Sequence, residues 1–220
     1  MQRHALIFGA TGAVGRELLG LCVEGDRYSK VLVIARRPRT IEHEKLHWIV
    51  SEFDALDRLQ TDSGMDGGDA FCCLGTTIKA AGSKAAFRRV DHDFVLNAAE
   101  FALRCGVKRF SLVSSIGANA QSRSLYTRTK GEVEAALIAM KFRSLQIFRP
   151  SLLKGERDEF RLAESIGNSV AVLMKPLFFI GLRKYQPVAM SKLAKAIYDS
   201  ADQEGADAVR VLESDEIQSY

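Results

Sequence analysis

Short apolar runs alternate with longer amphipathic segments from one end of the chain to the other. The apolar runs are rich in Val, Ile, Leu and Phe, residues that favour strands. They predict strands at residues 5–8, 31–35, 47–50, 70–74, 109–115, 145–148 and 208–212. Several of these runs are apolar without alternation, as expected where helices cover both faces of a sheet.

The segments between these strands follow the helical period of 3.6 residues. They predict helices at 13–24, at 84–105, at about 124–140 and at 191–201. Repeated strand–helix–strand order implies parallel pairing with right-handed crossovers. We therefore predict an α/β fold, namely a Rossmann-type doubly wound parallel sheet of about seven strands with helices on both faces.

A chain of 220 residues can bury roughly 70% of its unfolded surface, so we predict that residues 1–220 form a single domain. The nucleotide-binding core is expected to cover about residues 1–150. The less regular segment 151–220 is expected to lie over the carboxyl edge of the sheet, where substrates usually bind.

The composition narrows the class of protein. The chain is 47% apolar and 26% charged, as an ordinary soluble globular protein is. Its 31 basic and 27 acidic residues give a net charge of +4 that is spread along the chain, so we expect no nucleic-acid binding. The four histidines follow no zinc-binding spacing, and we therefore expect no metal site. No nucleoside-triphosphatase or serine-hydrolase motif occurs.

We expect a cytoplasmic protein. The N-terminal residues contain no secretion signal, and the four cysteines (22, 72, 73 and 105) lie in apolar surroundings typical of buried, reduced thiols. The longest apolar stretch, 170–182, is too short to span a bilayer. We expect it to form a core helix and loop, and a surface-seeking or homodimer-forming segment is the alternative.

The sequence GATGAVG at 9–15 opens the first predicted helix directly after the first predicted strand. Gly9 permits a tight turn, Gly12 lets the backbone approach a pyrophosphate, and Gly15 lets the helix press on the strand. Thr11 either hydrogen-bonds the phosphate or caps the helix. With a strand before it and a second strand about 20 residues later, this glycine pattern predicts a dinucleotide site.

The residues after the second predicted strand distinguish between two cofactors. An NAD site expects a carboxylate here to bind the ribose 2′-hydroxyl, but this strand is followed by Arg36 and Arg37. Two guanidinium groups suit the 2′-phosphate of NADP(H). Asp54, after the third strand, is a candidate for contact with the adenine, and a helix cap is the alternative.

The chain resembles the atypical short-chain dehydrogenase/reductases in four segments, GATGAVG, CCLGTT, LVSSIGA and YTRTK. Within that superfamily, CCLGTT together with LYTRTKGEVE and FRPSLLKGER is similar to the Tat-interacting-protein-like oxidoreductases, an NADPH-binding group. The resemblance covers nearly the whole chain. It implies cofactor contacts at Thr11, Gly12, Ala13, Val14, Arg36, Arg37, Leu74, Gly75, Leu153 and Arg161.

The resemblance also gives a chemical context to Tyr126 and Lys130, which lie one helical turn apart. In a short-chain reductase the tyrosine hydroxyl protonates the carbonyl oxygen as hydride is transferred. Free tyrosine has a pKa of about 10, and a nearby ammonium favours its phenolate. Lys130 is further implied to hold the nicotinamide ribose.

A hydroxyl at the end of the fifth strand is expected to polarise the substrate oxygen. We favour Ser115 from the family pattern, and Ser114 and Thr127 are the alternatives. Asn97 has the position of a water-positioning asparagine, but its apolar surroundings favour a satisfied amide.

Two functions fit these observations. The first is an NADPH-dependent oxidoreductase that acts on a small carbonyl or alcohol substrate. The second is an NADPH-binding, redox-sensing regulatory or protein-assembly factor without metabolic turnover, which uses the 170–182 segment to contact a protein partner.

Overall fold

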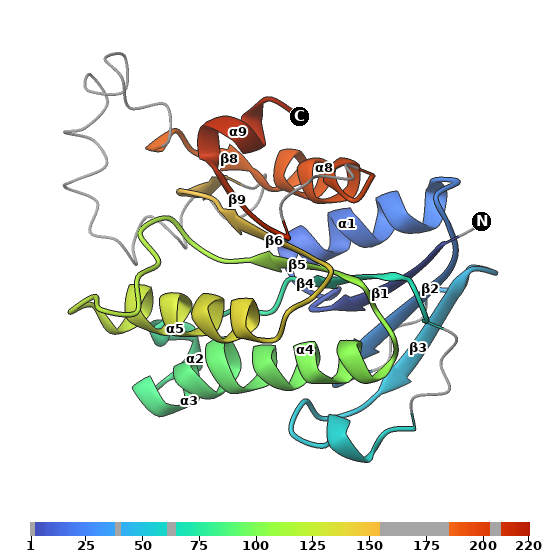
Figure 1. The fold of residues 1–220 in the computed structure, drawn as a ribbon, viewed down its shortest axis with the longest axis horizontal. Coiled ribbons are helices and arrows are strands. Elements are labelled where there is room, and N and C mark those ends of the chain that lie inside the picture. The colour runs from blue at the N-terminus through green and yellow to red at the C-terminus, as the bar shows by residue number, and fades with distance from the viewer. Residues whose placement is uncertain (1–2, 38–40, 61–64, 155–184, 203–207) are drawn as a thin grey trace.

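One parallel sheet organises the molecule (Figure 1). The computed structural model describes residues 3–37, 41–60, 65–154, 185–202 and 208–220. The strands of the sheet are β1 (Arg3–Phe8), β2 (Tyr28–Ala35), β3 (Leu46–Val50), β4 (Asp69–Cys72), β5 (Arg109–Val113), β6 (Ser144–Arg149) and β9 (Val209–Glu213). They lie in the order β3-β2-β1-β4-β5-β6-β9, and every neighbouring pair is parallel. The predicted doubly wound sheet of seven strands is confirmed.

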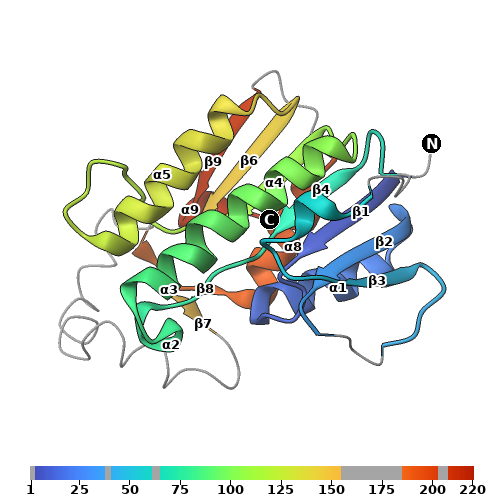
Figure 2. The same ribbon diagram turned by 90° about the horizontal axis from the view of Figure 1, so that it is seen from below.

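Helices cover both faces of this sheet. One face carries α1 (Ala13–Glu24), α8 (Met190–Ser200) and α9 (Ser214–Gln218). The other carries α2 (Ile78–Ala81), α3 (Lys84–Arg88), α4 (Phe94–Arg104) and α5 (Leu125–Ala139). Figure 2 shows this second layer from below, with α4 beside α5.

Strand β1 is buried on both faces, which explains its unbroken apolar sequence. Leu6 and Phe8 pack into the core under α4 and α5, whereas Ala5 and Ile7 pack into the core under α1 and α8. Successive side chains of a strand point to opposite faces, so one run of four apolar residues contributes to two cores.

The predicted helix over 84–105 is interrupted in the structure. A π-helical turn, η2 (Arg89–Asp93), lies between α3 and α4. A π turn holds more residues than an α turn, so the side chains that follow it are rotated relative to an unbroken helix. This turn brings Asp91 into the interior, where it is 1% exposed.

The sequence patterns did not predict several short elements. These elements are α2, the 3-10 turn η1 (Leu56–Arg58), and a small parallel pair formed by β7 (Leu153–Lys154) and β8 (Val188–Ala189). Segments of two to four residues are too short to show either the strand or the helix period.

Helix α1 packs closely on the turn that precedes it, and substitutions of two glycines in α1 can test this packing. A Cβ atom added at Gly15 would lie 2.1 Å from the carbonyl oxygen of Gly9, whereas one at Gly20 meets nothing within 4 Å. We expect Gly15→Ala to lower the free energy of unfolding by about 3 kcal/mol through overpacking. Gly20→Ala, in the same helix, should raise it by about 0.5–1 kcal/mol. Chemical denaturation measures both, and equal effects would contradict this packing.

Candidate functional site

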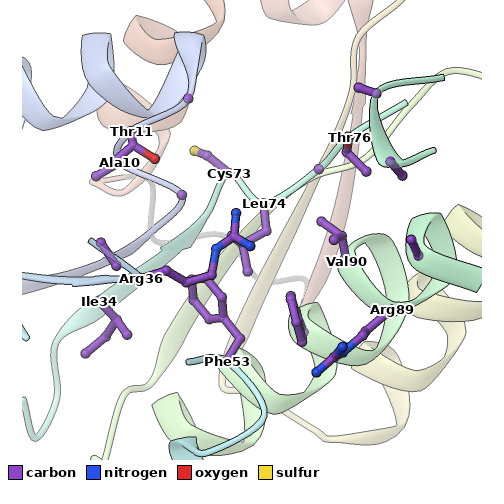
Figure 3. A pocket seen from close by; sticks show the side chains of 18 of the residues that line it. Ala10, Thr11, Ile34, Arg36, Phe53, Cys73, Leu74, Thr76, Arg89 and Val90 are labelled. Carbon is purple, nitrogen blue, oxygen red and sulfur yellow. The ribbon is translucent and has the colours of Figure 1, made fainter. Parts of the chain in front are cut away.

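A cavity of about 1020 Å³ opens at the carboxyl ends of the central strands (Figure 3). Its walls come from the turn after β1, the end of β2, Phe53, the loop after β4, and the segment from α2 to the start of α4. The order of strands reverses between β1 and β4, and ligands of open α/β sheets bind at such a switch point. The volume is sufficient for a dinucleotide's adenosine and pyrophosphate.

The turn after β1 forms one wall of this pocket. Gly9 has a φ of +83°, in the left-handed region that favours glycine, and its carbonyl oxygen accepts a hydrogen bond from the Gly12 N–H at 3.0 Å. Gly12 is the N-cap of α1 and makes no side-chain capping bond, so Thr11 does not cap this helix. Thr11 instead lines the pocket, where the helix N-terminus presents backbone N–H groups suited to a phosphate.

The two residues that follow Gly12 lie apart from the pocket surface. Ala13 and Val14 form the first positions of α1, and Val14 is buried against the core under that helix. Neither side chain is among the described residues that line the pocket. Their implied contacts with a cofactor would therefore involve backbone N–H groups.

Guanidinium groups surround the opening of the pocket. Arg36 and Arg37 line it from the end of β2, both exposed, and Figure 3 shows the Arg36 side chain extending into the pocket. Arg89 lines the opposite wall, near the Phe94 ring. Sequence reasoning missed Arg89, because the predicted continuous helix gave no reason to place it beside the second strand. No carboxylate is among the described lining residues.

Asp54 lies beside the pocket rather than in its described lining. Its carboxylate forms an ion pair with Arg89. The hydrogen bond from that guanidinium is the main cause that lowers the pKa of Asp54. The cap of η1 is Ala55, so Asp54 does not fill the predicted capping position. Its contact with adenine stays a prediction.

The loop after β4 forms the floor between the two walls. Cys73, Leu74, Gly75 and Thr76 all line the pocket, including the two positions that the family resemblance implied. Cys72 packs in the core under α4 and α5, whereas Cys73 contacts the core on the other face, as alternation along a strand requires.

Tyr126 and Lys130 lie on the first two turns of α5. The Tyr126 ring stacks on Phe87, with ring centroids 5.6 Å apart. The Lys130 ammonium is buried, and its Nζ lies 2.8 Å from Oδ1 of Asp91. Burial by itself lowers the pKa of Lys130, but the charges of Asp91 and Tyr126 outweigh it and leave the pKa above its ordinary value.

The candidate hydroxyl groups differ in how firmly they are engaged. Ser114 is buried and donates to Glu134 Oε1 at 2.5 Å, and Glu134 also accepts from Arg149. The Thr127 hydroxyl is hydrogen-bonded to that of Ser122 at 2.6 Å. Ser115 is half-buried and makes a longer hydrogen bond, 3.3 Å, to the Ile116 carbonyl. Ser115 is thus the hydroxyl most available to a ligand.

Like Ser115, Tyr126 and Lys130, the remaining predicted positions are not in the described pocket lining, or they fall outside the described residues. Asn97 donates from Nδ2 to the Phe53 carbonyl at 3.0 Å, which confirms it as a satisfied amide. Leu153, in β7, packs against the core under α1 and α8 and is not in the described pocket lining. Arg161 and the 170–182 segment fall outside the described residues.

The part of the chain that the structure describes contains neither a metal-binding cluster nor a membrane-spanning helix. Its His, Cys, Asp and Glu side chains form no group of three that is able to hold a metal ion. None of its helices combines the length and the apolar character needed to cross a membrane.

Comparison with known sequences identifies relatives over most of the chain. A family model described as NAD(P)H-binding matches residues 9–154. Protein HTATIP2 of Rattus norvegicus is 42% identical over 167 residues, which are 74% of this chain and 68% of that protein. Mitochondrial protein FMP52-2 of Scheffersomyces stipitis is 35% identical over 189 residues, which are 81% of this chain and 82% of that protein. The resemblance found in the sequence is confirmed.

Solved structures agree on the fold. MoeE5 in complex with UDP-glucuronic acid and NAD superimposes with a TM-score of 0.67 at 18% identity, covering 95% of this chain and 75% of that one. A short-chain dehydrogenase/reductase superfamily protein from Agrobacterium tumefaciens with bound NAD gives a TM-score of 0.66 at 17% identity, with 96% and 77% covered. At these identities the likeness shows a shared Rossmann fold.

The names of the relatives correct one prediction. We expected a cytoplasmic location from the cysteines and the N-terminal sequence. The FMP52 proteins of Scheffersomyces stipitis, Eremothecium gossypii and Lodderomyces elongisporus are named mitochondrial, and this finding contradicts that expectation. Buried reduced thiols are compatible with more than one compartment, so they could not decide it.

The cysteines give a test of the site's interior. Burial raises the pKa of Cys72 to about 12, and it also raises the pKa of Cys22. Because the thiolate is the reactive form, we expect these two buried thiols to react with a disulfide reagent at mildly alkaline pH only after denaturation, whereas Cys73, which is half-buried and lines the pocket, is more accessible. A thiol introduced at exposed Glu100 on α4 (Glu100→Cys) should react at once in the native protein. Rapid native labelling of Cys72 would contradict its burial.

Proposed function

The chain belongs to the NAD(P)H-binding family, and from that membership we propose that it is an NADPH-dependent oxidoreductase of the short-chain dehydrogenase/reductase type. Its substrate would be a small carbonyl compound or the corresponding alcohol. The observation that carries the proposal is the pocket at the switch point, which combines a glycine turn with three guanidinium groups and has no carboxylate in its described lining.

The described residues fit a phosphorylated dinucleotide. The N–H groups at the start of α1 would bind the pyrophosphate, and Gly12 leaves the backbone accessible. Arg36 and Arg37 would bind the 2′-phosphate, for which a guanidinium is the best-matched partner. A carboxylate at this position would instead accept from a ribose hydroxyl and repel the phosphate.

The chemical step would use groups on α5 and at the end of β5. A bound nicotinamide would supply or accept a hydride. Tyr126 would donate its hydroxyl proton to the substrate oxygen, and Ser115 would donate a hydrogen bond to the same oxygen. Lys130 has three N–H donors, so its contact with Asp91 leaves two to hold the phenol oxygen and the nicotinamide ribose.

The ion pair between Lys130 and Asp91 supports a second candidate function. Asp91 neutralises the Lys130 ammonium, which weakens the pull of that charge on the Tyr126 phenol. This observation favours an NADPH-binding regulatory or assembly factor that keeps the residues of a reductase without metabolic turnover. Tight NADPH binding, with no turnover over a broad carbonyl panel, would support it over the oxidoreductase.

The arginines test the choice of cofactor. Hydrogen bonds to charged groups contribute about 1.5–3 kcal/mol, so Arg36→Ala or Arg37→Ala should weaken NADPH binding roughly 10- to 100-fold. NADH binding should change little, because NADH lacks the 2′-phosphate. Calorimetry measures both affinities, and Arg16→Ala, an exposed arginine of α1 outside the described lining, is the control. Equal losses for the two cofactors would contradict the phosphate assignment.

Removing the Tyr126 hydroxyl tests the proposed proton transfer separately from NADPH binding. General acid catalysis contributes about 10²–10⁴-fold, so Tyr126→Phe should lower kcat for NADPH-linked carbonyl reduction by at least that lower limit. The dissociation constant for NADPH should stay close to that of the parent. Tyr198→Phe removes a phenol on α8, across the sheet, and should leave kcat unchanged. A mutant at Tyr126 that turns over like the parent would rule out this mechanism.

A further inference from the structure

The π-helical turn η2 turns a charged side chain towards the helix that carries Tyr126. Asp91 is 1% exposed and Lys130 is 4% exposed, so the ion pair between them is shielded from water. Figure 2 shows α4, which continues from η2, lying beside α5. A π turn inside a helix is frequently found at a functional site. Here it places a carboxylate where the sequence pattern predicted an uninterrupted helix.

The second carboxylate oxygen of Asp91 has a different partner. Oδ2 accepts a hydrogen bond from the backbone N–H of Thr76 at 2.7 Å. Thr76 lies in the loop after β4 and lines the pocket. One carboxylate therefore joins Lys130 of α5 to the loop that forms the pocket floor.

Gly75 separates this ion pair from the pocket. A Cβ atom added at Gly75 would lie 3.4 Å from Asp91 Oδ1 and 3.6 Å from Lys130 Nζ. Gly75 itself lines the pocket. The two charges thus lie next to Gly75, on the side to which a side chain at that position would point.

Stability alone does not explain this arrangement. A buried ion pair generally stabilises a fold no better than two apolar side chains of the same volume, because both charges must leave water. A fixed carboxylate does something that an apolar side chain cannot do, since it holds an ammonium at one point with a defined geometry. The other titratable groups that act on Lys130 are Tyr126 on its own helix and Cys72 on β4.

We propose that Asp91 is a positioning residue of this site, which holds the Lys130 ammonium behind Gly75 and, through Thr76, fixes the pocket floor relative to α5. This positioning role rests on the proposed function, in which Lys130 and the pocket floor belong to the same cofactor site. Asp91 acts through these two groups and does not itself contact substrate.

The first test follows the ionisation of Lys130 and needs no cofactor. An NMR titration of isotope-labelled lysine side chains, with Lys130→Met to assign the signal, should show Lys130 charged beyond the range of the exposed lysines. Asp91→Asn should move its titration to lower pH, because burial then acts without a compensating carboxylate. An unchanged titration in Asp91→Asn would overturn the proposal.

The second test measures coupling through NADPH affinity. Asp91→Asn and Lys130→Met should each raise the NADPH dissociation constant at least tenfold, and the double variant should be no worse than the weaker-binding single variant. Additive losses would overturn the proposal. Glu132→Gln is the matched control, because it breaks the more exposed Arg88–Glu132 pair that joins α3 to α5 and should leave the affinity unchanged.

A third variant separates position from charge. Asp91→Glu keeps the carboxylate but lengthens the side chain by one methylene. Because the buried Lys130 keeps a partner of opposite charge, this variant can be used if Asp91→Asn does not fold. We expect Lys130 to remain charged in this variant while the NADPH dissociation constant rises at least tenfold. Affinity equal to that of the parent would overturn the positioning role. If the parent binds neither nicotinamide cofactor, the proposed function fails, and the NMR titration still decides whether Asp91 holds Lys130.

Discussion

Strand β1 pairs with β2 on one side and with β4 on the other, and the site depends on this double pairing. The chain leaves β1 through α1 on one face of the sheet, and the later crossover through α4 covers the opposite face. The loops after β1 and β4 therefore diverge above the sheet edge and leave a pocket between them. Burial of β1 on both faces fixes its register, because a shift of one residue would exchange the contents of the two cores.

The two ends of the proposed site use charge in different ways. Arg36 and Arg37 are exposed at the pocket opening, where an anion can replace water around them at little cost, and exposed Arg89 pairs there with Asp54. Lys130 and Asp91 lie out of solvent behind the floor, where a charge without its partner is costly. Exposed cations suit recognition of a mobile phosphate, whereas a buried pair suits a group that must not move.

The sequence anticipated the glycine turn and the arginines that line the pocket better than the contacts around Lys130. The glycine turn and Arg36 belong to segments whose place follows from the first two strands, so local pattern was enough. Asp91 and Arg89 were missed because the helix period was assumed to continue through η2. Asn97 donates to the Phe53 carbonyl, as its apolar surroundings in the sequence had indicated for a satisfied amide. Ser114 and Ser115 could not be separated by pattern, because their difference lies in contacts with Glu134 from α5 and with the neighbouring backbone.

The sequence by itself determined the seven parallel strands, the helices between them and the glycine turn after the first strand, because these depend on hydrophobic period and on glycine at short spacing. It also determined that the second strand ends in guanidinium groups rather than a carboxylate. Only the tertiary structure decided which charge lies opposite Lys130, which serine is engaged by Glu134, and that Arg89 reaches the pocket. The contacts of these residues, Ser114 with Glu134, Asp54 with Arg89 and Asp91 with Lys130, join positions 20 to 39 apart on different elements, and no local pattern encodes the angle at which a π turn aims a side chain.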